Sequence, residues 1–134
     1  MLKADVLLAD DNPAMLDHVS NLLRTDNHYN VVGALNNGAD VLREYERLRP
    51  DVIVLDISMD MLSGIDVAHH LRNEGCRAKI VFLTVHEDFD FLNAAMGAGG
   101  SAYVVKSRLS TDLIPAINAA LSNKLFVSPN LLYT

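Results

Sequence analysis

The sequence has one cysteine, no tryptophan and no long hydrophobic run. A single thiol, Cys76, excludes an internal disulfide framework and fits a reducing compartment. No apolar stretch approaches the roughly 18 residues that a membrane-spanning helix needs. Asp10 and Asp11 also interrupt the N-terminal apolar run too early for a signal peptide. We therefore expect a cytoplasmic protein that makes no contact with a membrane.

Basic residues are also scarce. The 134 residues include 11 lysines and arginines against 17 aspartates and glutamates, which gives a net charge of −6. Because nucleic-acid binding depends on neutralising phosphate charge, we expect no direct binding to nucleic acid by this domain. Half of the residues are hydrophobic, and a chain of this length can bury the core of one domain.

The most informative stretch that is present is 52–60, VIVLDISMD. Its four leading aliphatic residues are typical of a strand buried on both faces of a parallel sheet. The run ends abruptly in a carboxylate, Asp56. Because ligands bind at the carboxyl ends of such strands, Asp56 is a candidate functional residue.

Similar strands alternate with helical patterns along the chain. We expect the fifth helix to begin between Ser110 and Asp112, because proline, here Pro115, is best tolerated in a first helical turn. Residues 125–134 are expected to form an extended tail. The alternation predicts an α/β fold of the flavodoxin-like (βα)5 type, a doubly wound parallel sheet of order 2-1-3-4-5. The predicted strands are 4–9, 30–35, 52–55, 79–84 and 102–105.

Chemically active side chains close four of these strands, and the predicted order makes the four strands neighbours. Three nearby carboxylates repel one another unless a cation is present, and Mg²⁺ suits carboxylate ligands. A lysine can pair with a carboxylate or a phosphate, and a hydroxyl can bond to an oxyanion. Together these groups describe phosphoryl transfer to an aspartate. The residues are Asp10, Asp11, Asp56, Thr84 and Lys106.

The chain resembles the receiver (response-regulator) domain of bacterial two-component signalling. The segments that match are LLADDNP, VIVLDISMDMLSG, IVFLTVHED and SAYVVKS. The last two are most similar to the NarL/FixJ subgroup, which carries a C-terminal LuxR-type DNA-binding domain. This resemblance implies a receiver domain at 1–122 and a tail or the start of an interdomain linker at 123–134, as in a piece of a longer protein.

The resemblance also implies roles for individual residues. Asp56 accepts the phosphoryl group of a sensor histidine kinase in a Mg²⁺-dependent reaction. Asp11, Asp56 and the backbone carbonyl of Ser58 bind the metal directly, and Asp10 binds it through water. Such a domain is not an enzyme beyond catalysing its own phosphorylation and dephosphorylation.

The remaining implied roles concern the response to phosphorylation. Lys106 pairs with the phosphate, and Thr84 bonds to it and draws its loop inward. Tyr103 then turns from exposed to buried, which changes an output surface. The implied partners are the kinase, a C-terminal DNA-binding output domain absent from this chain, which controls transcription, and a second copy in a phosphorylation-dependent homodimer.

Three positions need separate comment. The family usually has proline four residues after the phosphoacceptor, whereas this chain has Asp60, which removes a backbone restraint and adds negative charge. Gly99 and Gly100 predict a soft approach to the fifth strand. His86 is either a residue at the mouth of the pocket that modulates phosphate lifetime or a solvated loop histidine.

Other classes of protein fit the pattern less well. A haloacid-dehalogenase-type phosphatase needs a second acid two residues after the nucleophile, where this chain has Ser58. An FMN-binding flavodoxin needs a phosphate loop after the first strand, where Asp10 and Asp11 would repel phosphate. The alternative within the family is a stand-alone or degenerate receiver that acts through protein contacts without phosphorylation.

Overall fold

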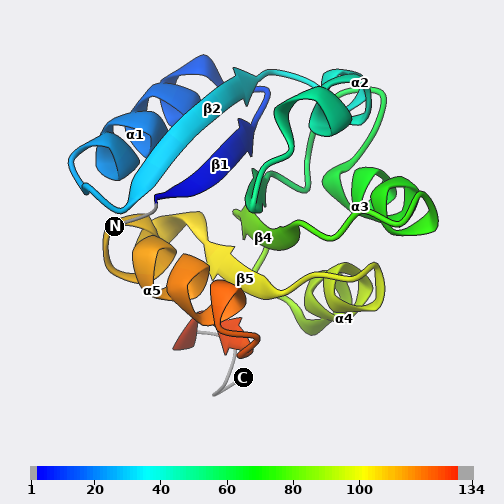
Figure 1. Ribbon diagram of the computed structural model, residues 1–134. Helices are drawn as coiled ribbons and strands as arrows, with labels where there is room; N and C mark the ends of the chain where they lie inside the picture. Colours follow the sequence, from blue (N-terminus) through cyan, green and yellow to red (C-terminus); the bar gives the residue numbers. More distant parts are fainter. Residues whose placement is uncertain (1–2, 130–134) are drawn as a thin grey trace.

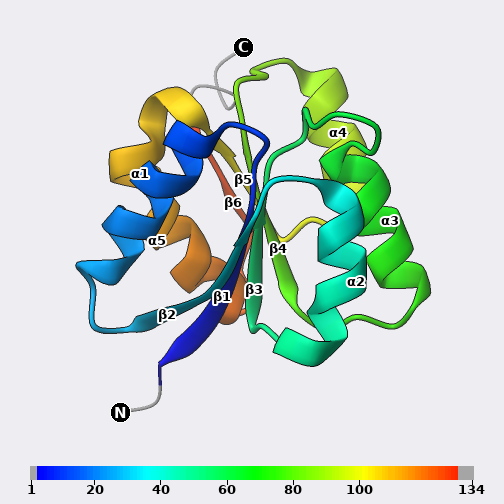
Figure 2. The same cartoon turned by 90° about the horizontal axis from the view of Figure 1, so that it is seen from above.

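A six-stranded parallel sheet forms the middle of three layers (Figures 1 and 2). The computed structural model describes residues 3–129. Helices α1 and α5 cover one face of the sheet, and α2, α3 and α4 cover the other. The order β2-β1-β3-β4-β5 confirms the predicted topology, and a short sixth strand follows β5 at the edge.

The elements alternate along the chain as predicted. The strands are β1 (Ala4–Ala9), β2 (Tyr29–Leu35), β3 (Val52–Leu55), β4 (Lys79–Thr84), β5 (Ala102–Val105) and β6 (Phe126–Val127). The α-helices are α1 (Pro13–Arg24), α2 (Gly38–Leu48), α3 (Gly64–Asn73), α4 (Phe89–Gly97) and α5 (Leu109–Leu121), and a 3-10 turn, η1 (Lys106–Arg108), precedes α5. Within the described part of the chain, no helix is long and apolar enough to cross a membrane.

The central strands are aliphatic on both faces because helices cover both faces. All four residues of β3 and all four of β5 are buried. Alternate residues of each strand therefore enter two separate cores, one under α1 and α5 and the other under α2, α3 and α4. Burial of this aliphatic surface, at about 25 cal/mol per Å², is the main term that holds the layers together.

Polar caps fix the starts of the first three helices at the carboxyl edge of the sheet. The Asn12 side chain accepts hydrogen bonds from the amides of Ala14 and Met15, and Pro13 takes the first helical position. Asn37 and Ser63 cap α2 and α3 in the same way. Each cap satisfies backbone N–H groups of the first helical turn and so fixes where the helix begins.

The predicted start of α5 was wrong. The helix begins at Leu109, directly after η1, and Pro115 lies inside it rather than in its first turn. Proline lacks the N–H that would bond to the carbonyl of Thr111. Both residues lie on the exposed side of α5, where water can satisfy that carbonyl, so the helix continues through the proline.

The expectation of an extended tail was also wrong for the residues that the structure describes. Phe126 and Val127 pair in parallel with Ala102 and Tyr103 of β5. A strand of two residues has no periodicity to detect, which is why the sequence pattern did not indicate it. The rest of the predicted tail, 130–134, lies outside the described residues.

The approach to β5 is tight rather than soft. Gly99 has a φ of +97°, a conformation that favours glycine, and its carbonyl accepts two hydrogen bonds from the Arg72 guanidinium, at 3.3 and 2.8 Å. The same guanidinium binds the carbonyls of Cys76 and Ala78 at 2.8 and 2.9 Å. Arg72 thus joins the end of α3, the start of β4 and the loop before β5.

Candidate functional site

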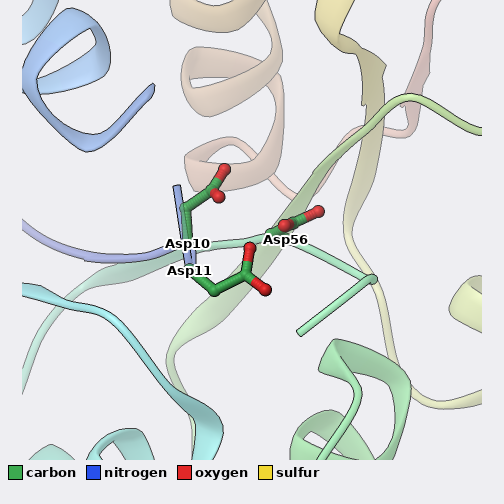
Figure 3. Close-up of side chains that lie close together, drawn as sticks. All are labelled: Asp10, Asp11 and Asp56. Atoms are coloured by element: carbon green, nitrogen blue, oxygen red, sulfur yellow. The ribbon is translucent and has the colours of Figure 1, made fainter. Parts of the chain in front are cut away.

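Three carboxylates meet at the carboxyl edge of the sheet (Figure 3). Asp10 and Asp11 follow β1, and Asp56 follows β3. The two strands are paired so that Ala9 lies opposite Leu55, which places the residues after them side by side. One oxygen of each carboxylate lies within 4.8 Å of the others.

The three carboxylates differ in their exposure to solvent. Asp10 and Asp56 are each only 4% exposed, whereas Asp11 is exposed and forms the open side of the cluster. The Oδ1 atom of Asp10 accepts a 2.9 Å hydrogen bond from the amide of Asn12. Its Oδ2 atom is buried without a well-aligned hydrogen bond, although the Lys106 ammonium lies 2.8 Å away.

Lys106 bridges two of the carboxylates. It follows β5, and its side chain reaches the cluster with only 14% of its surface exposed. The ammonium nitrogen lies 2.8 Å from Asp10 Oδ2 and 3.4 Å from Asp56 Oδ2. One buried cation therefore compensates two buried anions and leaves the site with excess negative charge.

The excess negative charge affects the protonation of Asp56. Burial raises its pKa from 3.8 to about 7, and the charge of Asp10 acts in the same direction. Lys106 and the amide of Ser58 act in the opposite direction but do not cancel the increase. A carboxyl group with this environment is stabilised as an anion when a further cation enters the cluster.

The loop after β3 is folded against the backbone of Asp56. The Gly64 amide donates a 2.8 Å hydrogen bond to the carbonyl of Ile57, and a Cβ atom at Gly64 would lie only 2.1 Å from the carbonyl oxygen of Asp56. The amide of Ser58 donates to Asp56 Oδ1 at 3.3 Å. The loop thus needs glycine at 64 to hold the carboxylate in place.

Asp60 lies farther out in the same loop. It is exposed and lines an open hollow of about 500 Å³ together with Asp11. Met61, next to it, has a φ of +70° and is fully exposed. The carboxylate of Asp60 is not one of the three that cluster, so its charge acts on the approach to the site rather than inside it.

The loop after β4 closes the other side of the site. Thr84 is fully buried, and its hydroxyl accepts a 3.2 Å hydrogen bond from the amide of His86. Tyr103 is also fully buried and donates a 2.8 Å hydrogen bond to the carbonyl of His86. Burial raises the pKa of the Tyr103 phenol above its ordinary value of 10, and the charge of Asp88 adds to this effect.

The His86 side chain connects this loop to the loop after β3. Its Nε2 atom lies 2.7 Å from Ser58 Oγ, and its ring stacks on Phe91 of α4 at a centroid distance of 3.8 Å. His86 is therefore held at the mouth of the site rather than solvated in a loop. Sequence reasoning left both interpretations open, because nothing in the sequence places Ser58 and Phe91 around this ring.

The structure brings together four of the side chains that the sequence places at strand ends, Asp10, Asp11, Asp56 and Lys106, while the hydroxyl of Thr84, at the end of β4, contacts the amide of His86. Their order on the sheet follows from the predicted topology. What the sequence did not reveal is the pairing of Lys106 with Asp10, the bridge between His86 and Ser58, and the inward position of Tyr103. These depend on side-chain conformations that no spacing of residues specifies.

The donor set fits a hard divalent cation. Three carboxylates with facing oxygens, one of them open to solvent, match the preference of Mg²⁺ for a few carboxylates together with water. The excess negative charge of the cluster and the raised pKa of Asp56 also favour the binding of a cation. The oxygen atoms present are those that such an ion prefers.

Curated relatives share the sequence over most of this chain. A transcriptional regulatory protein, YvfU of Bacillus subtilis, is 31% identical over 96% of this chain and 64% of its own length. The nitrate/nitrite response regulator NarP of Escherichia coli is 36% identical over 90% of this chain and 57% of its own length. The chain thus spans less than two thirds of the length of these relatives.

Solved structures share the fold. A LuxR-family response regulator from Aurantimonas superposes with a TM-score of 0.92 at 30% identity, covering 97% of this chain and 93% of that one. The isolated receiver domain of RcsB from Salmonella enterica, determined with a phosphomimetic, gives 0.88 at 25% identity over 97% of this chain and 96% of its own. A family model, the response regulator receiver domain, matches residues 6–118, which include every strand-end residue of the site. The chain therefore belongs to the response regulator receiver domain family.

Proposed function

We propose that Asp56 is the phosphoacceptor of this receiver domain. The observation that carries the proposal is the environment of its carboxylate, which lies at the end of β3 between Asp10, Asp11 and the ammonium of Lys106. In the proposed reaction an Asp56 oxygen attacks the phosphorus of a phosphohistidine. The phosphorus–nitrogen bond breaks, and its electron pair stays on the imidazole of the donor.

Asp11 and Asp56, with the backbone carbonyl of Ser58, would hold Mg²⁺, and Asp10 would contact it through water. When bound, the ion would neutralise charge on the transferring phosphoryl group. The protein residues orient the reaction. Asp10 holds the Lys106 ammonium at 2.8 Å, where it can move to a phosphate oxygen on Asp56. The amide of Ser58 donates a hydrogen bond to Asp56 Oδ1 and so restrains its carboxylate.

The proposed switch involves Thr84 and Tyr103. A phosphate on Asp56 would offer a charged acceptor to the proton of the Thr84 hydroxyl, whose oxygen accepts a hydrogen bond from the His86 amide and so links the phosphate to that loop. The loop after β4 would then move, and with it the carbonyl that the Tyr103 phenol binds. The output is a changed surface on α4, β5 and α5, a two-state element biased by a local change of charge.

The activity of the whole protein is a further part of the proposal. The curated relatives are transcriptional regulators of which this chain spans 54% to 64%. We therefore propose a sensor histidine kinase as phosphodonor, a DNA-binding output domain that acts on transcription, and a homodimer formed on phosphorylation. The domain catalyses only its own phosphorylation and dephosphorylation and acts in the cytoplasm.

The alternative is a receiver that signals through protein contacts without phosphorylation. It predicts a site in which one of the charged residues is lost or misplaced. Here the carboxylates of Asp10, Asp11 and Asp56 lie within 4.8 Å of one another and Lys106 contacts two of them, which favours a receiver that is phosphorylated.

Intact-mass measurement with a small phosphodonor tests the proposal. The protein is incubated with acetyl phosphate in Mg²⁺ and, separately, in EDTA. We expect a gain of one phosphoryl group in Mg²⁺ only, and none in Asp56→Asn. Asp17→Asn, which changes an exposed carboxylate of α1, is the matched control and should gain it normally. A gain that persists in Asp56→Asn would refute the assignment, and no gain in any variant would favour the alternative.

A further inference from the structure

A buried polar network joins the segment after α5 to the strand that carries Lys106. Ser128 is fully buried, and Asp112 of α5 is only 4% exposed. The Ser128 hydroxyl donates a 2.8 Å hydrogen bond to Asp112 Oδ2 and accepts one of 3.0 Å from the amide of Val105. The amide of Ser128 also binds the carbonyl of Tyr103 at 2.9 Å.

The other side of Asp112 binds Arg108. The guanidinium donates to both carboxylate oxygens, at 2.8 and 3.2 Å, and the hydroxyl of Thr111 donates to Oδ1 at 3.2 Å. Burial acts to raise the pKa of Asp112, but the hydrogen bonds from Arg108, Ser128 and Thr111 outweigh it, so the pKa lies below its usual value. The carboxylate is therefore held as an anion with both oxygens occupied.

This network brackets Lys106. The residue before it, Val105, is held through its amide by Ser128, and the 3-10 turn that Lys106 begins is held through Arg108 by Asp112. Ser128 and Asp112 are bonded to each other, so both restraints form one unit. The backbone that presents the Lys106 side chain to Asp10 and Asp56 is thus fixed on either side.

The chemistry of the network argues against a role in packing alone. A buried ion pair costs desolvation free energy, and an apolar side chain of similar volume is commonly as stabilising. What a carboxylate with directed hydrogen bonds supplies is a defined geometry. That geometry lies next to the one cation that, among the described residues, contacts the acidic cluster.

We propose that Ser128, with Asp112 and Arg108, is a positioning residue for Lys106, so that the segment after α5 and the phosphoacceptor site are coupled. The proposal rests on the proposed function for the role of Lys106 in phosphoryl transfer. It assigns to residues 126–128 a part in the site itself. Any shift of that segment changes the position of the ammonium group, and phosphorylation of Asp56 changes the restraint on that segment in return.

The first test follows the side chain of Lys106 without any phosphodonor. The nitrogen signal of its ammonium group is recorded by NMR in Mg²⁺-free wild type, Ser128→Ala and the control Ser110→Ala, which removes an exposed serine hydroxyl from α5, the helix that carries Asp112. We expect the signal to move toward that of a solvated lysine in Ser128→Ala only. A signal that is identical in wild type and Ser128→Ala would overturn the proposal, whether or not the protein is phosphorylated.

The second test measures phosphorylation by acetyl phosphate as a double-mutant cycle. Ser128→Ala removes the hydroxyl that bonds to both Asp112 and Val105 and should slow the reaction about tenfold, within the range expected for the loss of one or two hydrogen bonds. In a Lys106→Ala background the same change should slow it no further, because the residue through which it acts is gone. Equal slowing in both backgrounds, or none in either, would show that Ser128 does not act through Lys106.

Arg108→Gln provides a milder variant if Ser128→Ala does not fold. The glutamine keeps one donor for Asp112, and the Arg108 side chain that it replaces is 37% exposed. It should show the same pattern with a smaller slowing, and additivity with Lys106→Ala would again refute the coupling. If wild type gains no phosphoryl group at all, the proposed function fails, and the NMR comparison alone decides the positioning of Lys106.

Discussion

The Tyr103 phenol donates a 2.8 Å hydrogen bond to the carbonyl of His86, and this bond closes the loop after β4 over the edge of the sheet. The same residue, His86, contacts Ser58 in the loop after β3 through its ring. The two loops that flank Asp56 are therefore connected through one histidine. We expect a movement of either loop to be transmitted through His86 to the other loop and to the buried tyrosine.

Tyr103→Phe tests the role of this bond. The ring stays in the core, but the carbonyl of His86 loses its donor, so the free energy of unfolding should fall by ~1 kcal/mol. Amide exchange should accelerate at residues 85–88. Hydrogen exchange with mass spectrometry measures this. The control is Tyr29→Phe, which removes a buried hydroxyl bonded to Asn118 elsewhere in the fold and should leave that loop unchanged. Unchanged exchange at 85–88 in Tyr103→Phe would contradict the prediction.

Asp56→Asn should change how stability depends on pH in EDTA. The fold raises the pKa of Asp56 from its ordinary value of 3.8 to about 7, so the folded state favours the neutral carboxyl. This contribution to the free energy of unfolding is complete below about pH 4 and is lost as the pH rises through 7. The variant cannot ionise there. At pH 8 it should exceed wild type by roughly 1 to 2 kcal/mol, a figure reduced for the solvent that reaches the site.

Urea unfolding at pH 5 and pH 8 measures this difference. Addition of Mg²⁺ at pH 8 should stabilise wild type and narrow the gap, because the ion favours the charged carboxylate. Asp17→Asn should behave as wild type in every condition. A wild type that is more stable than Asp56→Asn at pH 8 in EDTA would show that the cluster does not disfavour the charged carboxylate.

His86→Ala should shorten the life of the phosphorylated protein. The imidazole, stacked on Phe91 and bonded to Ser58, covers the mouth of the site, and its removal admits water to the acyl phosphate. We expect dephosphorylation to accelerate several-fold, measured by intact mass after removal of the phosphodonor. His70→Ala, at an exposed position of α3, should have no effect. An equal or longer lifetime in His86→Ala would exclude the shielding role.

Gly64→Ala should disturb the site through the backbone. The added Cβ would lie 2.1 Å from the carbonyl oxygen of Asp56, so the loop after β3 must move. We expect a loss of ~2 kcal/mol in unfolding free energy and slower phosphorylation by acetyl phosphate. Gly97→Ala provides the contrast, because nothing lies within 4 Å of its Cβ and alanine favours the helix. Equal stability of the two variants would refute this account of the loop.

The sequence predicts the sheet order and the meeting of the strand-end residues because both depend on strong aliphatic runs. The short aliphatic run before Asp56 is typical of a buried strand, and the rules of chain connection leave few topologies. The sequence is a poorer guide where the surroundings of one residue override the usual behaviour of its type. Pro115 suggested a helix start, but its exposed position lets water replace the missing bond. Gly99 suggested flexibility, whereas Arg72 binds its carbonyl.

The site shows the same division. The identity of the charged residues follows from their place after the strands, but the pairing of Lys106 with Asp10 depends on which rotamer the buried ammonium adopts. The role of Ser128 depends on a two-residue strand that pairs with β5 from a distant part of the sequence. Contacts of this kind become visible only when the backbone has been placed.

The short strand β6 also limits how this domain can associate with copies of itself. A strand at the border of a sheet offers unpaired N–H and C=O groups that can template the addition of another chain. Here Phe126 and Val127 occupy those groups on Ala102 and Tyr103, and the Ser128 hydroxyl takes the amide of Val105. A second copy therefore cannot pair with β5 directly, and the edge strand on this side, β6, is only two residues long, which offers little template for another strand.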